Sequence, residues 1–282
     1  MIKGVEIIHI TDCSSFKDVF TPASTNFDLG ALREYVTSDT SFDQSDVILE
    51  GETSEMNEYT PNMTYPSYLL HTCHHLQHLE LHKDGRVKEV VFEMDSQRPL
   101  LLPYLQVLEL HGLKDMSHVW KCNWNNFLIP QHHPLQFPFQ NLTNISLEHC
   151  HNIKYLFSPL MAKFLSNLKD VYVEECDGIE EVVSSRDDEN KETTPSTSSH
   201  QHTTLFPCLD ILTLHILSGL KRIDGADQSQ LSAQAVGACW SLCQCPRRIY
   251  IEMCDALSSL IPWYAPQQMK RLEELKVQWC TR

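Results

Sequence analysis

The hydrophobic and polar positions of residues 142–183 repeat after 26 residues. Apolar residues or cysteine occupy offsets 0, 3, 5, 8, 11 and 14 from Leu142, and the same offsets from Leu168 are filled in the same way. Apolar residues at offsets 3 and 5, with other residues between them, are typical of a β-strand that buries one face. One such strand cannot bury that face alone, so the repetition predicts a stack of similar units with a continuous core.

The pattern L-x-x-L-x-L-x-x-C/N is that of a leucine-rich repeat. It predicts an α/β solenoid, with a parallel β-sheet on the concave face and short helices or irregular loops on the convex face. In the first copy, Ser158 suits the N-cap of a helix and Pro159 its first position. The inward side of this helix would carry Leu160, Met161, Phe164 and Leu165.

The same frame recurs at irregular intervals. Repeats begin at positions 5, 76, 105, 142, 168, 209, 246 and 272. We therefore expect a partial leading repeat in residues 1–20 and irregular repeats over 71–282, truncated at the C-terminus because the last repeat stops two residues past its cysteine. Residues 21–70 lack the pattern and carry nine acidic residues against one arginine, which predicts an acidic, disordered insertion where FDLGALREYV could form one short helix. The polar segment 184–204 is expected to be a mobile loop.

Charge and composition narrow the class of partner. The formal net charge of −15 disfavours nucleic-acid phosphates and anionic membrane surfaces as partners. The chain has no run of 18 apolar residues and no features of a signal peptide, so neither a transmembrane helix nor secretion is predicted. Five of the eleven cysteines fall on the loop position of the repeat, a role suited to a reduced compartment. We expect a cytoplasmic or nucleo-cytoplasmic protein.

No motif in the chain indicates catalysis or a cofactor. The sequence contains no G-x-S-x-G, H-E-x-x-H or G-x-x-x-x-G-K-[ST] motif, so we expect neither an enzyme nor a cofactor site. Two stretches invite a metal site: one contains His71, Cys73, His74, His75, His78 and His82, and the other Cys239, Cys243 and Cys245. In the repeat frame His78 and His82 are simply outward strand positions, and the cysteines form no C-x-x-C pair. No metal site is therefore predicted.

The outward positions at offsets 4 and 6 form two columns on the predicted concave face. Neighbouring parallel strands lie about 4.8 Å apart, so each column is a ladder of adjacent side chains. We predict an acidic, histidine-containing protein-binding surface with Tyr172 and Tyr250 as aromatic anchors; the alternative is a solvated face without a ligand. The predicted binding residues are Glu80, His82, Glu109, His111, Ser146, Glu148, Tyr172, Glu174, Thr213, His215, Tyr250, Glu252, Lys276 and Gln278.

The segment FPFQNLTNISLEHCHNIKYLFSPLMAKFLSNLKDVYVEECDGIEEVV resembles the C-terminal leucine-rich repeats of plant coiled-coil NB-ARC disease-resistance proteins, in particular the large resistance-gene family of lettuce. The phrases H-x-x-x-I-K-x-L-F-S-P and C-x-x-I-E-E-V-V carry this resemblance, and WSLCQCPRRIYIEMCDALSSLIPWYAPQQMKRLEELKV is similar to another segment of that family. The resemblance covers most of the chain outside residues 21–70.

This resemblance implies a piece of an intracellular immune receptor, whose repeats sense a pathogen effector or a guarded host protein. In such receptors the repeats also hold the NB-ARC module inactive. The chain lacks the phosphate loop and the coiled coil, so the ADP or ATP site of a full-length receptor has no counterpart here. Of the functions of such a receptor, the resemblance therefore implies only recognition and autoinhibition for this chain. The alternative is a truncated, non-signalling paralogue or decoy that acts as a generic protein-interaction scaffold.

Overall fold

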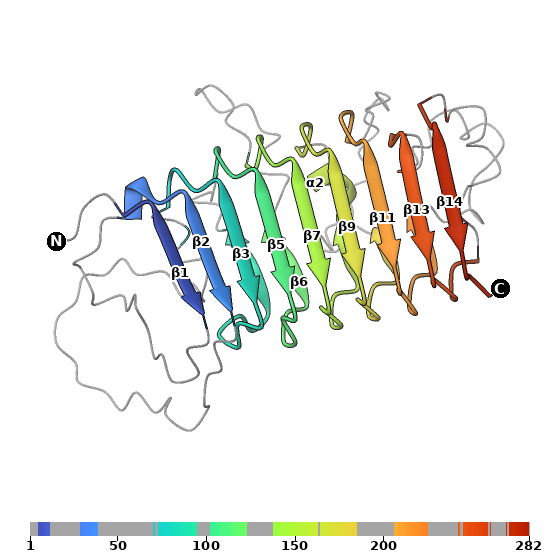
Figure 1. The fold of residues 1–282 in the computed structure, drawn as a ribbon, viewed down its shortest axis with the longest axis horizontal. Coiled ribbons are helices and arrows are strands. Elements are labelled where there is room, and N and C mark those ends of the chain that lie inside the picture. The colour runs from blue at the N-terminus through green and yellow to red at the C-terminus, as the bar shows by residue number, and fades with distance from the viewer. Residues whose placement is uncertain are drawn as a thin grey trace, which may run out of the picture.

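The computed structural model describes most of the expected repeats. The described residues are 5–11, 29–38, 70, 73–94, 102–122, 138–162, 164–184, 206–224, 242, 245–258, 260, 269 and 271–281. Figure 1 shows their strands arranged side by side in one long array that follows the order of the chain.

Most of the described strands belong to one parallel sheet. Among the described residues it has nine strands, in the order β1-β2-β3-β5-β7-β9-β11-β13-β14. Equal offsets of neighbouring repeats pair directly, as Leu147 does with Val173 and His215 with Glu252. The strands are β1 (Ile7–Thr11), β2 (Glu34–Ser38), β3 (His78–His82), β5 (Val107–His111), β7 (Asn144–Glu148), β9 (Asp170–Glu174), β11 (Ile211–His215), β13 (Arg248–Glu252) and β14 (Glu274–Gln278).

The core lies behind this sheet and follows from the alternation of the repeat. Strands β2, β3, β5, β7, β9, β11 and β13 share one pattern, in which offsets 3 and 5 are buried and the residues around them are partly exposed. Loop residues at offsets 8, 11 and 14, such as Cys150, Ile153 and Leu156, are buried against them. The buried side chains form one cluster that runs along the array from Ile10 to Cys254. The predicted α/β solenoid with a parallel sheet is confirmed.

The cysteines of the repeat close the turn that follows each strand. Cys150 and Cys176 are buried free thiols, and the Cys150 N–H donates a hydrogen bond to Cys176 Sγ at 3.3 Å. In four of the described repeats offset 8 is a cysteine, and its thiol donates a hydrogen bond to the carbonyl at offset 6 of the same turn. The pairs are Cys150 with Glu148, Cys176 with Glu174, Cys254 with Glu252 and Cys280 with Gln278. Cys13, at the same position of the first repeat, lies outside the described residues.

The other side of the array carries short strands that the sequence pattern does not predict. There, β8 (Tyr155–Phe157), β10 (Glu181–Val183) and β12 (Arg222–Asp224) form a three-stranded parallel sheet. A second parallel pair is formed by β4 (Val90–Met94) and β6 (His118–Cys122). In the three-stranded sheet, stacking brings equal offsets of neighbouring repeats within hydrogen-bond reach, as for Glu181 with Tyr155 and with Arg222. Strands β4 and β6 pair with a shift of one residue, because Val90 lies opposite His118.

The predicted helix is present but short. Helix α2 (Pro159–Ala162) begins directly after Ser158, whose Oγ accepts a hydrogen bond from the Met161 N–H at 3.2 Å. This is the N-cap contact that the sequence predicts. Met161, Phe164 and Leu165 are buried as expected, whereas the side chain of Leu160 lies outside the described residues.

The prediction of a disordered insertion over residues 21–70 is wrong for residues 29–38. This segment forms a 3-10 helix, η1 (Leu29–Ala31), and strand β2, which pairs with both β1 and β3. FDLGALREYV is therefore not one helix. Leu32, Tyr35 and Thr37 occupy offsets 0, 3 and 5 of a further repeat and are fully buried. The pattern is hidden because threonine replaces an aliphatic residue at offset 5.

Most of the other regions that were expected to be irregular lie outside the described residues. The remaining residues of 21–70, apart from Leu70, lie outside the described residues, as do residues 185–204 of the predicted loop. At the other end of the array, β14 is the last described strand, and the core-facing side chains of Leu275 and Val277 are 42% and 46% exposed. None of the helices in the described segments has the length and hydropathy needed to span a membrane.

Candidate functional site

The face of the nine-stranded sheet that points away from the core, here called the open face, carries the residues at offsets 2, 4 and 6. The structure places all fourteen predicted binding residues on this face, because each lies at an outward position of its strand. Their direct neighbours are set by the register, which pairs Glu148 with Glu174 and Tyr250 with Lys276. Their role in binding stays a prediction.

The open face is strongly acidic. It carries eight carboxylates and two permanently basic side chains among the described residues. The carboxylates are Glu34, Glu80, Glu109, Glu148, Asp170, Glu174, Glu252 and Glu274, and the basic side chains are Arg248 and Lys276. The face also carries five histidines, namely His9, His78, His82, His111 and His215.

Three of these carboxylates and Arg248 lie at offset 2, outside the binding surface that the sequence predicts. Glu34, Asp170 and Glu274 are as outward as the residues at offset 4, because a strand alternates with a period of two. The signal was present in the sequence, since each of these residues directly precedes a core position. Of the three, Glu34 is paired with His9 Nε2 at 2.7 Å, and Asp170 accepts a hydrogen bond from Asn144 Nδ2 at 3.0 Å.

At offset 6, carboxylates and histidines contact one another from strand to strand. His215 lies between Glu174 and Glu252, with its Nδ1 2.8 Å from Glu174 Oε1 and its Nε2 3.7 Å from Glu252 Oε1. Further along the row, His111 Nδ1 lies 3.2 Å from Glu148 Oε2. The partners in these contacts are 37 to 41 positions apart in the sequence, and only the stacking of the repeats brings them together.

Two tyrosines on this face are held by carboxylates. The Tyr172 hydroxyl donates a hydrogen bond to Glu174, and the Tyr250 hydroxyl donates to Glu274 Oε2 at 2.8 Å. The hydrogen bond from Tyr172, and after it the one from His215, holds the pKa of Glu174 below its ordinary value. The pKa of Tyr172 is raised, first by burial of the hydroxyl and then by its hydrogen bond to Glu174. At neutral pH, Glu174 therefore stays charged and Tyr172 stays protonated, so the bond between them is maintained.

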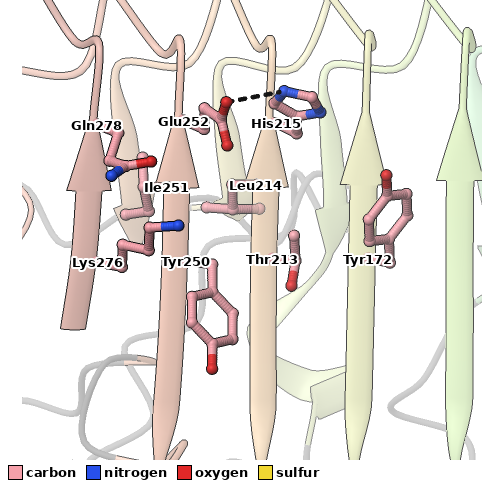
Figure 2. Close-up of a pocket in the computed structure, with 9 residues that line it drawn as sticks. All are labelled: Tyr172, Thr213, Leu214, His215, Tyr250, Ile251, Glu252, Lys276 and Gln278. Carbon is pink, nitrogen blue, oxygen red and sulfur yellow. Dashed lines mark ion pairs between the residues drawn. The ribbon is translucent and has the colours of Figure 1, made fainter. Parts of the chain in front are cut away.

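A hollow of about 280 Å³ opens between the two tyrosines. It forms because Thr213 on β11 is much smaller than Tyr172 on β9 and Tyr250 on β13, the strands on either side. Figure 2 shows the two rings on opposite sides of Thr213 and the contact of His215 with Glu252 at the edge. The hollow is lined by Tyr172, Thr213, Leu214, His215, Tyr250, Ile251, Glu252, Lys276 and Gln278, seven of which are predicted binding residues.

The stretches considered for a metal site from the sequence are spread over different environments. Cys73 is buried, His74 and His75 are exposed on a loop, and only His78 and His82 reach the open face. In the cysteine-rich stretch Cys245 is buried, and burial raises its pKa to about 11. The remaining members, His71, Cys239 and Cys243, lie outside the described residues.

Comparison with known families identifies the repeat. The family of leucine-rich repeats of RPS2-like plant disease resistance proteins matches residues 126–281, more than half of the chain. This chain belongs to that family. No curated protein and no solved structure matches it. The RPS2-like repeats are protein-interaction modules of plant resistance proteins, and among the described residues the open face spans nine strands.

Proposed function

We propose that the open face of these RPS2-like repeats recognises a protein with a basic surface. The partner would be a pathogen effector or the host protein that the effector modifies, and in the resting receptor it would be the NB-ARC module. The observation that carries this proposal is the row of Glu148, Glu174 and Glu252 beside the hollow between Tyr172 and Tyr250.

Charge and shape favour a basic partner. Eight carboxylates against two basic residues produce a negative potential across the face, which speeds encounter with a positive surface and disfavours an acidic one. Tyr172 and Tyr250 are partly exposed rings whose hydroxyls are already bonded. They can cover a partner side chain without first losing much conformational freedom, which is typical of hot-spot residues. A lysine or arginine that entered the hollow would meet Glu252 at its edge.

The same surface can serve both recognition and autoinhibition. A module that binds the open face would be displaced by a second protein that competes for the same carboxylates. We propose that the repeats act in the cytoplasm, where buried free thiols such as Cys150 and Cys176 stay reduced.

The first test measures the affinity of the full chain for the NB-ARC module of a receptor of this family. We expect the affinity to fall roughly tenfold or more when NaCl is raised from about 0.05 to 0.5 M, because salt screens charges on a surface. The variant Glu148→Lys/Glu174→Lys/Glu252→Lys should lose a comparable amount at low salt. Glu180→Lys is the control for a single charge reversal, because it makes the charge change of one of these three substitutions at an exposed residue outside the open face.

The second test removes the aromatic anchors. Tyr172→Ala and Tyr250→Ala should each weaken binding by about tenfold to thirtyfold, the usual effect of a tyrosine hot spot. Tyr104→Ala is the matched control, because Tyr104 is 47% exposed but lies on a loop, where it stacks on His75. Affinity that responds neither to salt nor to any of these substitutions would contradict the proposal. A chain that binds no NB-ARC module would favour the non-signalling scaffold.

A further inference from the structure

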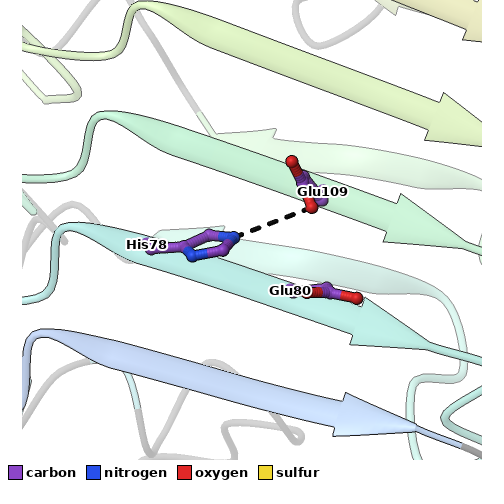
Figure 3. Close-up of side chains that lie close together, drawn as sticks. All are labelled: His78, Glu80 and Glu109. Atoms are coloured by element: carbon purple, nitrogen blue, oxygen red, sulfur yellow. Dashed lines mark ion pairs between the residues drawn. The ribbon is translucent and has the colours of Figure 1, made fainter. Parts of the chain in front are cut away.

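A second group of side chains on the open face lies away from the tyrosine hollow. His78 and Glu80 are both on β3, and Glu109 stands directly opposite Glu80 on β5. One imidazole nitrogen of His78 and one oxygen of each carboxylate lie within 4.8 Å of one another, and His78 Nε2 is 3.7 Å from Glu109 Oε2. Figure 3 shows the three side chains on the same face, with the imidazole nitrogen directed at Glu109.

The contacts within the protein leave this group unsatisfied. His78 Nε2 is buried and has no hydrogen-bond partner. Glu80 and Glu109 are like charges in directly paired positions, an arrangement that destabilises a sheet. No lysine or arginine among the described residues forms an ion pair with either carboxylate, and the ion-pair contact of Glu109 is with His78. Glu174 and Glu252 differ from this pair, because His215 lies between them and contacts both carboxylates.

We propose that His78, Glu80 and Glu109 bind a divalent transition-metal ion of the zinc class. One such ion would give the unpartnered nitrogen a ligand bond and neutralise the two opposed carboxylates. Imidazole nitrogen together with carboxylate oxygen suits zinc, cobalt or nickel, whereas calcium and magnesium prefer oxygen alone.

The geometry is close to that of a tetrahedral site. Zinc binds nitrogen and oxygen at about 2.0–2.2 Å, which places two ligand atoms of a tetrahedron roughly 3.4 Å apart. The 3.7 Å between His78 Nε2 and Glu109 Oε2 is near this value. Glu80 would complete the set by a side-chain rotation, which its partly exposed position allows. Three protein ligands leave a fourth position toward the open side, where water or a side chain of a bound protein can coordinate the ion.

From the sequence, His78 is simply an outward strand position, and no metal site is predicted there. The ligand set crosses between strands, and Glu109 is 31 positions from His78. His82 and His111 lie at the next outward positions of the same strands, with ring centroids 5.8 Å apart. They are the neighbouring groups that could compete for the same ion, so the test must separate the two sites.

The experiment titrates Zn²⁺ into the full chain carrying Cys208→Ser, which removes the exposed thiol of the described residues. Isothermal titration calorimetry should detect one ion per chain. His78→Ala should abolish this binding, and Glu109→Gln should weaken it about tenfold or more. His215→Ala is the matched control and should leave zinc binding unchanged, because it removes a histidine from another His–Glu contact of the open face. Co²⁺ should give visible ligand-field bands without thiolate-to-metal charge transfer.

Several outcomes would overturn the proposal. The proposal fails if the chain binds no zinc, or if the His78→Ala variant binds zinc as tightly as the parent chain. It also fails if His82→Ala abolishes zinc binding while His78→Ala retains it, or if Co²⁺ gives a thiolate-to-metal charge-transfer band. Circular dichroism checks that His78→Ala folds, and His78→Gln provides a second variant that keeps the size of the side chain. The result is independent of whether the tyrosine hollow binds a protein, because no residue is shared between the two sites.

Discussion

Glu174 is the residue at which the contacts of the open face converge. Its carboxylate accepts hydrogen bonds from the Tyr172 hydroxyl and from His215 Nδ1, the latter at 2.8 Å. Because both donors favour the charged form, the pKa of Glu174 lies below its ordinary value. The charged carboxylate therefore contributes stability above the ordinary pKa of glutamate, and this contribution is lost as the pH falls through the lowered pKa.

We expect Glu174→Gln to reduce the pH dependence of stability. At about pH 6 the variant should unfold at lower urea than the parent chain, and the difference should disappear as the pH is lowered toward about 3. Urea unfolding followed by circular dichroism over this range measures the difference. Tyr172→Phe, which removes the first of the two donors, should show part of the same effect. Parallel curves for the parent and for Glu174→Gln would show that the carboxylate is not stabilised by these contacts.

At the scale of single elements, β2 shows what a repeat can tolerate in its core. Thr37 takes the place of an aliphatic residue between Ile10 and Leu81, its partners on the neighbouring strands. The side chain is completely buried, and its hydroxyl has no hydrogen-bond partner. The strand forms nevertheless, because Leu32 and Tyr35 bury their apolar side chains and the backbone pairs on both sides.

Thr37→Val should therefore stabilise the protein. Valine has nearly the shape of threonine and removes a buried hydroxyl whose desolvation is not compensated, so the free energy of unfolding should rise by about 1 kcal/mol. Chemical unfolding of the full chain provides the measurement. Thr37→Ser is the opposite control, because it keeps the hydroxyl, loses the methyl group and should destabilise. Lower stability of Thr37→Val would mean that the hydroxyl has a partner in solution.

At the scale of the whole molecule, two pairs of successive turns approach each other closely at a glycine. A Cβ atom placed on Gly178 would lie 2.1 Å from the His151 carbonyl oxygen of the preceding repeat. A Cβ atom placed on Gly219 would likewise lie 2.1 Å from the Asp177 carbonyl oxygen. Both glycines are at offset 10, and the contact leaves no room for a side chain. Each repeat is stabilised mainly by its two neighbours, so a local separation weakens two interfaces.

Gly178→Ala should cost about 2 kcal/mol or more in the free energy of unfolding, because the obstructing atoms are backbone and the two turns must move apart. Urea unfolding of the full chain tests this. Asn152 has the same offset in the preceding repeat, where its Nδ2 donates to the Lys114 carbonyl at 2.5 Å on the surface. Asn152→Ala should therefore cost about 1 kcal/mol or less. Equal effects of the two substitutions would show that the glycine contact does not determine the spacing.

Much of the fold was predictable because each repeat encodes its own strand. The local pattern alone predicts Val171 and Val173 as core residues and Ser158 as a helix cap, and the structure has them in those places. The strand at Glu34–Ser38 was missed because Thr37 breaks the apolar alternation. The short strands at Tyr155–Phe157 and Glu181–Val183 were missed because their pairing depends on a neighbouring repeat and not on their own residues.

By itself the sequence determined which side chains face the core and which face outward, because that alternation is a property of each strand. It also determined the solenoid, since no single repeat can bury its apolar face. Only the tertiary structure decided which outward side chains are neighbours. Successive repeats begin 26 to 44 positions apart, so contacts such as His215 between Glu174 and Glu252, or Glu109 beside His78, follow from the register of the stacked strands and not from distance along the chain.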